Sequence, residues 1–139
     1  MSSFTTSLKV EIPTAGKKVI LLEEFTYHIG SEDSDIFITV PAGFRTDLAS
    51  TPFFSWSLGF PRWGRYSKAA VLHDHCYSLN LHNRKWADGL FYEAMLVSGT
   101  GLWKAKVMYL AVRLFGWIAW NKHKNKIYPL HPLLQRGKF

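Results

Sequence analysis

Side chains that can carry chemistry are concentrated in two short runs, HDHCY, which holds His73, Asp74 and Tyr77, and ADGLF, which holds Asp88. On a helix, residues three and four apart share a face, so Tyr77 lies beside both His73 and Asp74. Apolar residues recur three and seven positions after Asp88, which places its carboxylate on the apolar side of a helix. An unpaired buried charge costs several kcal/mol. We therefore expect Asp88 to pair with His73.

A carboxylate that holds one ring nitrogen of a histidine leaves the other nitrogen available as a general base. Hydrolysis at His73, with Asp88 holding the ring, is one interpretation of this pattern. The second is a polar network that only fixes two helices, because strongly perturbed pairs are often structural. The third is a transition-metal site, but neighbouring helical residues point about 100° apart, so four consecutive side chains cannot bind one ion.

Other candidate residues carry weaker signals. We expect His75 and His82 to face solvent, and Cys76 to be a small buried group rather than a nucleophile. Asp47 lies in the loop PAGFRTDLASTP, which can bring it near the helices. The most common role of such an aspartate is to bond the amides of a turn.

Helices are predicted for the C-terminal part of the chain. The stretch 66–95 has helical spacing on both sides of a short polar turn, which predicts an antiparallel hairpin with Ser67 as its N-cap. Gly99 and Gly101 end the second helix, and a third is expected over 102–122. Its stripe comprises Trp103, Val107, Leu110, Ala111, Leu114, Trp117 and Ile118. We expect this stripe to complete the core; the alternative is a helix that lies among lipid headgroups.

Short alternating segments predict strands over 8–12, 17–22, 25–29 and 36–40. The expected fold is α+β, with one small N-terminal antiparallel sheet, an aromatic loop and a three-helix C-terminal part. We expect a single domain, 1–139. Its parts would be a β-rich segment (1–40), a loop (41–65), a helical segment (66–122) and a basic extended tail (123–139).

Composition restricts the class of protein. The chain has 139 residues, 47% of them apolar, which is enough for one core. The net charge of +7 favours an anionic partner such as nucleic acid, a phospholipid surface or an acidic protein. We expect no nucleic-acid binding, because neither an aromatic-interleaved sheet nor helix-turn-helix spacing is present. We also expect no signal peptide and no transmembrane segment. The single Cys excludes a disulfide framework.

The linked segments VPAGFRTDLASTP, GRYSKAAVLHDHCYS, RKWADGLFYEAM and YLAVRLFG resemble the family catalogued as domain of unknown function 1353. That family occurs in bacteriophages and in bacteria that carry prophages. The resemblance implies a phage-associated protein, located in the virion or in the host cytoplasm. Its partners would be other phage structural proteins.

The order HD-x-x-Y followed by an aspartate on a second helix is also similar to the active site of phospholipase A2. This resemblance implies that His73 activates water, that Tyr77 and Asp88 hold the histidine, and that Asp74 binds Ca²⁺. Secreted phospholipases supply further calcium ligands from a glycine-rich loop. Here the upstream loop offers Asp47.

Two functions follow from these patterns. The first is a phospholipase A2-like, metal-assisted hydrolase that acts on lipid or another ester. The second is a non-catalytic virion, tail or assembly component in which the His/Asp network is structural.

Overall fold

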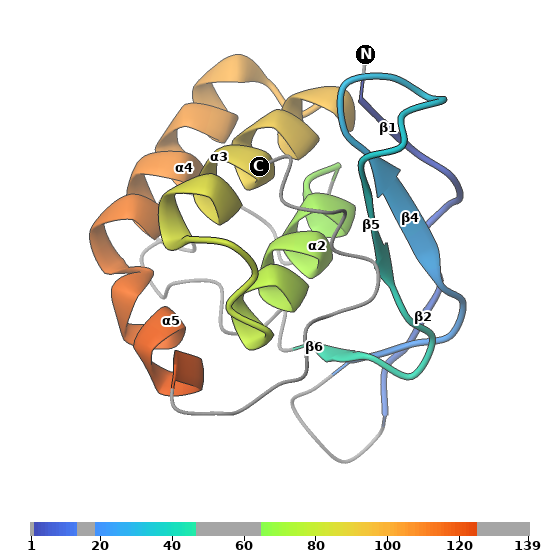
Figure 1. Ribbon diagram of the computed structural model, residues 1–139, viewed down its shortest axis with the longest axis horizontal. Coiled ribbons are helices and arrows are strands. Elements are labelled where there is room, and N and C mark those ends of the chain that lie inside the picture. Colours follow the sequence, from blue (N-terminus) through green and yellow to red (C-terminus); the bar gives the residue numbers. More distant parts are fainter. Residues whose placement is uncertain (1, 14–18, 47–64, 125–139) are drawn as a thin grey trace.

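The described part of the chain, residues 2–13, 19–46 and 65–124 of a computed structural model, is an α+β fold in which strands precede helices (Figure 1). The strands are β1 (Ser3–Phe4), β2 (Val10–Glu11), β3 (Val19–Leu21), β4 (Phe25–His28), β5 (Phe37–Val40) and β6 (Arg45–Thr46). The helices are α2 (Ser67–Ser78), α3 (Arg84–Val97), α4 (Leu102–Phe115) and α5 (Trp117–Lys124).

The strands form two antiparallel three-stranded sheets, in the orders β1-β4-β5 and β2-β3-β6. In the first sheet Phe25 pairs with Val40 and Tyr27 with Ile38. These four side chains are almost fully buried, while their neighbours along each strand are less so, which is the alternation of a sheet with one face on the core. The sheets therefore cover one side of the helices.

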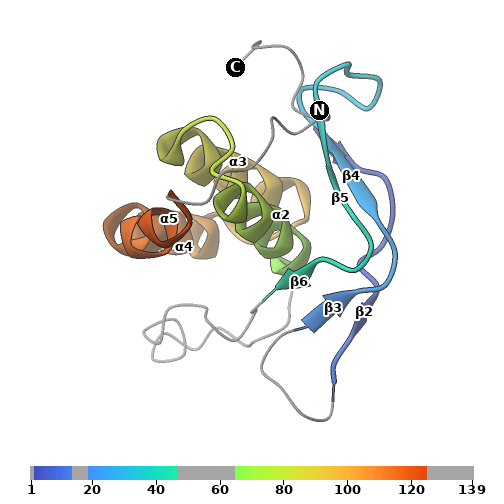
Figure 2. The same ribbon diagram turned by 60° about the horizontal axis from the view of Figure 1, so that its bottom comes forward.

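The helices form two further layers behind the sheets (Figure 2). Helix α2 contacts β5 and β6 on one side and α3 on the other, and α4 packs on α3. One polar link joins sheet to helix, because the Tyr27 hydroxyl donates to Oε1 of Glu93 at 2.8 Å. Helices α4 and α5 are thus the outermost elements, on the side away from the sheets (Figure 2).

Helices α2 and α3 both end with a residue of positive φ. After α2, Asn80 has φ 47°, and the amides of Asn80 and Leu81 bond the carbonyls of Tyr77 and Cys76. After α3, Gly99 has φ +85°. The backbone amides of Gly99 and of the residue that follows it donate to carbonyls in the last turn of α3 in the same way. Both ends satisfy carbonyls that would otherwise lack donors. The turn between α2 and α3 therefore has a defined geometry, and it fixes how the hairpin closes.

The α+β class, the N-terminal position of the strands and the antiparallel hairpin were predicted correctly. The expected antiparallel strands are present at the N-terminal end, and with the additional short strands β1 and β6 they form two sheets. Ser67, however, is not an N-cap, since Tyr66 precedes the helix without a side-chain cap. Instead, the side chain of Asn83 caps α3 by accepting from the amide of Trp86 at 2.8 Å. Of the expected tail, 125–139 lies outside the described residues.

The structure differs from the predicted third helix in two ways. The helix is divided at Gly116 into α4 and α5. Most of its stripe also faces outward, because Leu110, Leu114 and Ile118 are exposed. The side of α4 that packs on the core consists of Ala105, Met108 and Ala111, of which only Ala111 belongs to the stripe.

Candidate active site

Asp88 is the centre of a polar cluster inside the helical layers. Its side chain is completely buried, in the second turn of α3. Nε2 of His73 lies 2.8 Å from Oδ1 of Asp88, and the hydroxyl of Tyr77 donates to the same oxygen at 2.5 Å. His73 and Tyr77 are one turn apart on α2, so one carboxylate oxygen ties α3 to two successive turns of α2. This confirms that the three side chains meet.

The second oxygen of Asp88 accepts from two arginines that the sequence did not single out. Nη1 of Arg113 lies 2.8 Å and Nη1 of Arg84 lies 3.3 Å from Oδ2. Arg84 also donates to the carbonyls of Val112 and Arg113, in the last turn of α4. Asp88 therefore joins α2, α3 and α4. Arg84 could have been suspected from its place four residues before Asp88; Arg113 is distant in sequence and gave no such signal.

Burial alone would raise the pKa of the Asp88 carboxyl. Hydrogen bonds from His73, Tyr77 and Arg113 outweigh that effect and hold the pKa below its usual value. Asp88 is consequently ionised at neutral pH and can only accept hydrogen bonds. The pKa of the Tyr77 hydroxyl is raised, first by burial and then by its bond to Asp88. Tyr77 therefore stays a neutral donor.

His73 is held on its faces as well as at Nε2. Its ring lies 4.2 Å from that of Tyr77 and 4.6 Å from that of Phe91, measured between centroids. Because Asp88 can only accept, Nε2 must carry the proton, and Nδ1 then presents a lone pair. No described residue forms a hydrogen bond with Nδ1, and 12% of the His73 side chain remains exposed. The ring is thus fixed, with one nitrogen available for proton transfer.

Of the two predicted metal ligands, only Asp74 lies within the described residues, so the predicted pair stays a prediction. Asp74 is half-buried and makes contacts of its own, and Asp47 lies outside the described ranges. Within those ranges, no group of three or more His, Cys, Asp or Glu could hold a metal ion.

Two neighbours of this cluster are buried. His75 was expected to face solvent, but it is only 3% exposed and its ring packs edge-on against Phe44. The prediction failed because α2 lies between the sheets and α3 and has no wide solvent face. Cys76 is buried as predicted, and burial raises the pKa of its thiol to about 12. Cys76 is therefore not a nucleophile at neutral pH. His82 is exposed as predicted.

The junction of α4 and α5 closes over Tyr77. The ring of Trp120 lies edge-on to that of Tyr77, with 5.2 Å between centroids. A side chain at Gly116 would overlap the Tyr77 hydroxyl and the carbonyl of Val112. Glycine is therefore required at this position for Tyr77 to reach Asp88.

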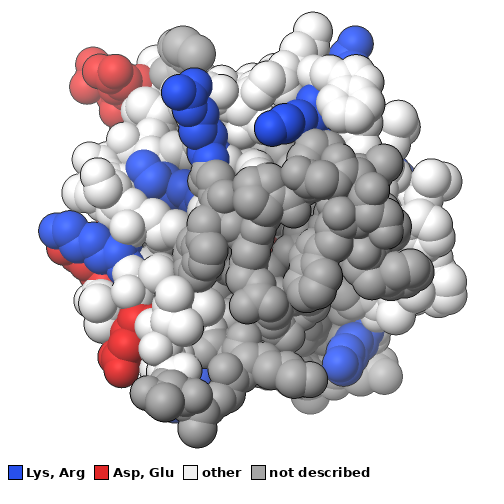
Figure 3. All heavy atoms as spheres, turned by 180° about the vertical axis from the view of Figure 1, so that it is seen from behind, with Lys and Arg blue, Asp and Glu red and all other residues white. Residues whose placement is uncertain are grey.

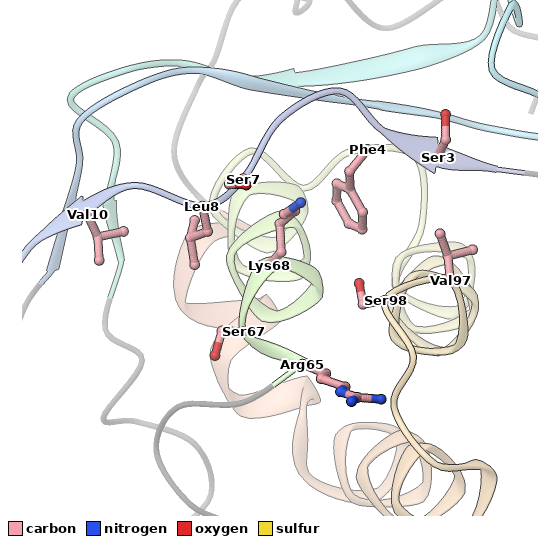
Figure 4. A pocket seen from close by; sticks show the side chains of 10 residues that line it. All are labelled: Ser3, Phe4, Ser7, Leu8, Val10, Arg65, Ser67, Lys68, Val97 and Ser98. Carbon is pink, nitrogen blue, oxygen red and sulfur yellow. The ribbon is translucent and has the colours of Figure 1, made fainter.

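A separate hollow of about 690 Å³ lies between β1, β2 and the N-terminal end of α2 (Figure 4). Arg65, Lys68 and Ser98 are among its lining residues; His73 is not. The Lys68 ammonium donates to the carbonyl of Thr6 at 2.6 Å and lies over the ring of Phe4. The hollow is thus distinct from the polar cluster at Asp88.

Fold and site together define an α+β protein in which a buried aspartate holds a partly exposed histidine in an antiparallel helical hairpin. The chain belongs to the protein family of unknown function DUF1353, whose family model matches residues 19–112. The matched region contains His73, Tyr77, Arg84 and Asp88 and ends one residue before Arg113.

Two relatives come from Sinorhizobium fredii (strain NBRC 101917 / NGR234). The uncharacterized protein y4jT is 38% identical over 91 residues, which are 63% of this chain and 27% of that protein. The uncharacterized protein y4iH is 39% identical over 75 residues, 52% of this chain and 30% of that protein. The chain thus matches less than a third of the length of either relative. No solved structure matches it significantly.

Proposed function

We propose that the protein hydrolyses carboxylic esters, lipid esters first among them, with His73 as the general base. One observation carries the proposal. Nε2 of His73 lies 2.8 Å from the buried, ionised Asp88 while Nδ1 bonds to no described residue. The phage setting that the family resemblance implies is part of the same proposal.

The proposed step needs no co-reactant besides water. Nδ1 removes a proton from a water molecule as its oxygen attacks the carbonyl carbon of the ester. The bond from that carbon to the alcohol oxygen then breaks, and the proton on Nδ1 passes to the departing alkoxide. The products are an acid and an alcohol. Asp88 stabilises the imidazolium that exists between the two transfers, and the rings of Tyr77 and Phe91 keep it in orientation.

Calcium bound at Asp74 remains a proposal from the phospholipase resemblance, and no part of the step above depends on it. It can be tested by thermal unfolding with and without Ca²⁺. Binding to the folded state raises the melting temperature by mass action. The proposal predicts such a rise in melting temperature for the wild type and none for Asp74→Asn. If no divalent ion shifts the melting temperature of the wild type, the proposed metal site is contradicted.

The catalytic proposal is tested by comparing wild type, His73→Gln and His82→Gln on a dispersed phosphatidylcholine and on a soluble short-chain ester. Loss of a general base lowers rates by about 10²–10⁴-fold. We expect that loss for His73→Gln and an unchanged rate for His82→Gln, because His82 is exposed. Circular dichroism shows whether each variant is folded. No turnover by the wild type, or equal rates for all three proteins, would contradict the proposal.

A second candidate is favoured by the two arginines on Asp88. With Arg84 and Arg113 in place, the carboxylate joins three helices whether or not His73 ever transfers a proton. The alternative proposal is therefore a non-catalytic virion or assembly component whose network is structural. Stable incorporation of the protein into purified particles, with no ester hydrolysis, would favour it. A protein that is absent from particles would count against it.

A further inference from the structure

An exposed apolar surface runs along α4 and α5. We define it as the outer face: Leu110, Leu114, Trp117 and Ile118, each 52% to 65% exposed. Leu114 lies four residues after Leu110, and Trp117 and Ile118 lie three and four residues after Leu114, so the four side chains form one stripe rather than scattered positions. Figure 2 shows that α4 and α5 are the layer farthest from the sheets. A contiguous exposed apolar stripe marks an interaction surface.

Packing within the chain explains only the opposite side of α4. Ala105, Met108 and Ala111 are buried against the other helices. The outer face has apolar side chains where a surface helix would normally carry polar ones. It exposes a large aromatic side chain, Trp117, which is suited to the boundary between water and an apolar phase.

The charge distribution selects the kind of partner. Residues 94–139 contain eight Lys or Arg and no Asp or Glu, so their net charge is +8, whereas residues 1–93 contain nine Lys or Arg and ten Asp or Glu, giving −1. In Figure 3 all visible acidic groups lie on the side away from α4 and α5. Lys106 and Lys122 are exposed on these two helices. The apolar stripe therefore belongs to the basic, C-terminal part of the sequence.

We propose that the outer face docks the protein on an anionic phospholipid surface. The apolar side chains would enter the boundary between headgroups and acyl chains, and the flanking lysines would contact the phosphates. A nucleic acid would pair with the lysines but leave the apolar stripe exposed to water. A second copy of the chain would cover the stripe but bring two positively charged surfaces together, which repel each other. Within the described residues no helix is long and apolar enough to cross a bilayer. The proposed docking places the outer face in the headgroup region, and it does not depend on the function proposed for His73.

Co-sedimentation of the full-length chain with vesicles tests this proposal. One vesicle is pure phosphatidylcholine, and the other is phosphatidylcholine with a quarter phosphatidylglycerol. We expect binding to the anionic vesicle that weakens strongly between about 0.1 M and about 1 M salt, as the Debye length falls from about 10 Å to about 3 Å. The double variant Leu114→Glu/Ile118→Glu should bind at least about tenfold more weakly, because it places two charges in the stripe.

Matched controls separate this surface from other effects. Ile12 and Leu22 are similarly exposed, at 64% and 56%, but belong to the sheet side. The variant Ile12→Glu/Leu22→Glu adds the same charge and should bind like the wild type. His73→Gln should also bind fully, which distinguishes docking from catalysis.

Three outcomes would overturn the proposal. The first is equal loss of binding in both double variants, which would reflect net charge alone. The second is absence of vesicle binding with tight, salt-sensitive binding of duplex DNA. The third is a wild-type dimer in sedimentation that the α4–α5 variant abolishes, because the outer face would then be covered by a second copy.

Discussion

Nη1 of Arg113 lies 2.8 Å from Oδ2 of Asp88, on the side of the carboxylate opposite to His73. This contact brings the last turn of α4 to a buried charge in the hairpin of α2 and α3. It makes Asp88 a junction of three helices and, at the same time, the group that orients His73. The stability of the helical layers and the geometry of the candidate active site therefore depend on the same side chain.

Asp88→Asn removes the charge that pairs with both arginines. Removing one partner of a buried ion pair costs about 3–5 kcal/mol, because the remaining charges lose their compensation; here the remaining charges are those of two half-buried arginines. We expect a loss of that order in the free energy of unfolding, measured with urea. The control is Glu23→Gln, which breaks an exposed pair with Lys9 at 2.8 Å and should change stability by less than about 1 kcal/mol. Equal losses in both variants would contradict the role given to Asp88.

The lowered pKa of Asp88 predicts how stability responds to acid. A carboxyl whose pKa is lower in the folded than in the unfolded state contributes stability above its unfolded value, here 3.8, and loses that contribution as the pH falls through the folded value. The difference in unfolding free energy between wild type and Asp88→Asn should thus be full at pH 5–7 and shrink below about pH 4. A difference that stays constant down to pH 2.5 would show that the charge of Asp88 is not stabilised by folding.

Tyr77→Phe removes the donor that lies 2.5 Å from Oδ1 of Asp88. A hydrogen bond to a charged group contributes about 1.5–3 kcal/mol, so we expect a loss of that size in the free energy of unfolding. Because His73 remains bound to Asp88, any ester hydrolysis should fall far less than in His73→Gln. Tyr92→Phe, on a half-buried residue of α3, is the control and should lie within about 0.5 kcal/mol of wild type. Unchanged stability of Tyr77→Phe would contradict the contact.

Substitution by alanine should change the melting temperature in opposite directions at Gly116 and at Gly89. A Cβ at Gly116 overlaps the Tyr77 hydroxyl and the Val112 carbonyl, whereas a Cβ at Gly89 meets nothing within 4 Å. Gly89 lies inside α3, where alanine is favoured over glycine by up to about 1 kcal/mol. Thermal unfolding should therefore show a higher melting temperature for Gly89→Ala and a lower one for Gly116→Ala. A rise for both variants would mean that α4 and α5 do not close over Tyr77.

Much of the site could be predicted from local spacing. His73, Tyr77 and Asp88 were found because helical periodicity places them on facing sides of a hairpin, and burial of a carboxylate demands a partner. Arg113 could not be found in this way, since its contact depends on how α4 crosses α3. The burial of the apolar stripe of α4 could not be predicted from local spacing either, because periodicity identifies two faces of a helix without deciding which one is buried. Here the small face, with Ala105 and Ala111, packs inward.

The orientation of His73 by Asp88 is tested most directly by the protonation of the imidazole nitrogens in solution. Nitrogen-15 NMR of the ¹⁵N-histidine-labelled protein at neutral pH, with the His73 signals assigned through His73→Gln, distinguishes the two tautomers. We expect the proton on Nε2 and a pyridine-type resonance for Nδ1 in the wild type, and loss of this preference in Asp88→Asn. A proton on Nδ1 in the wild type would contradict the proposed base.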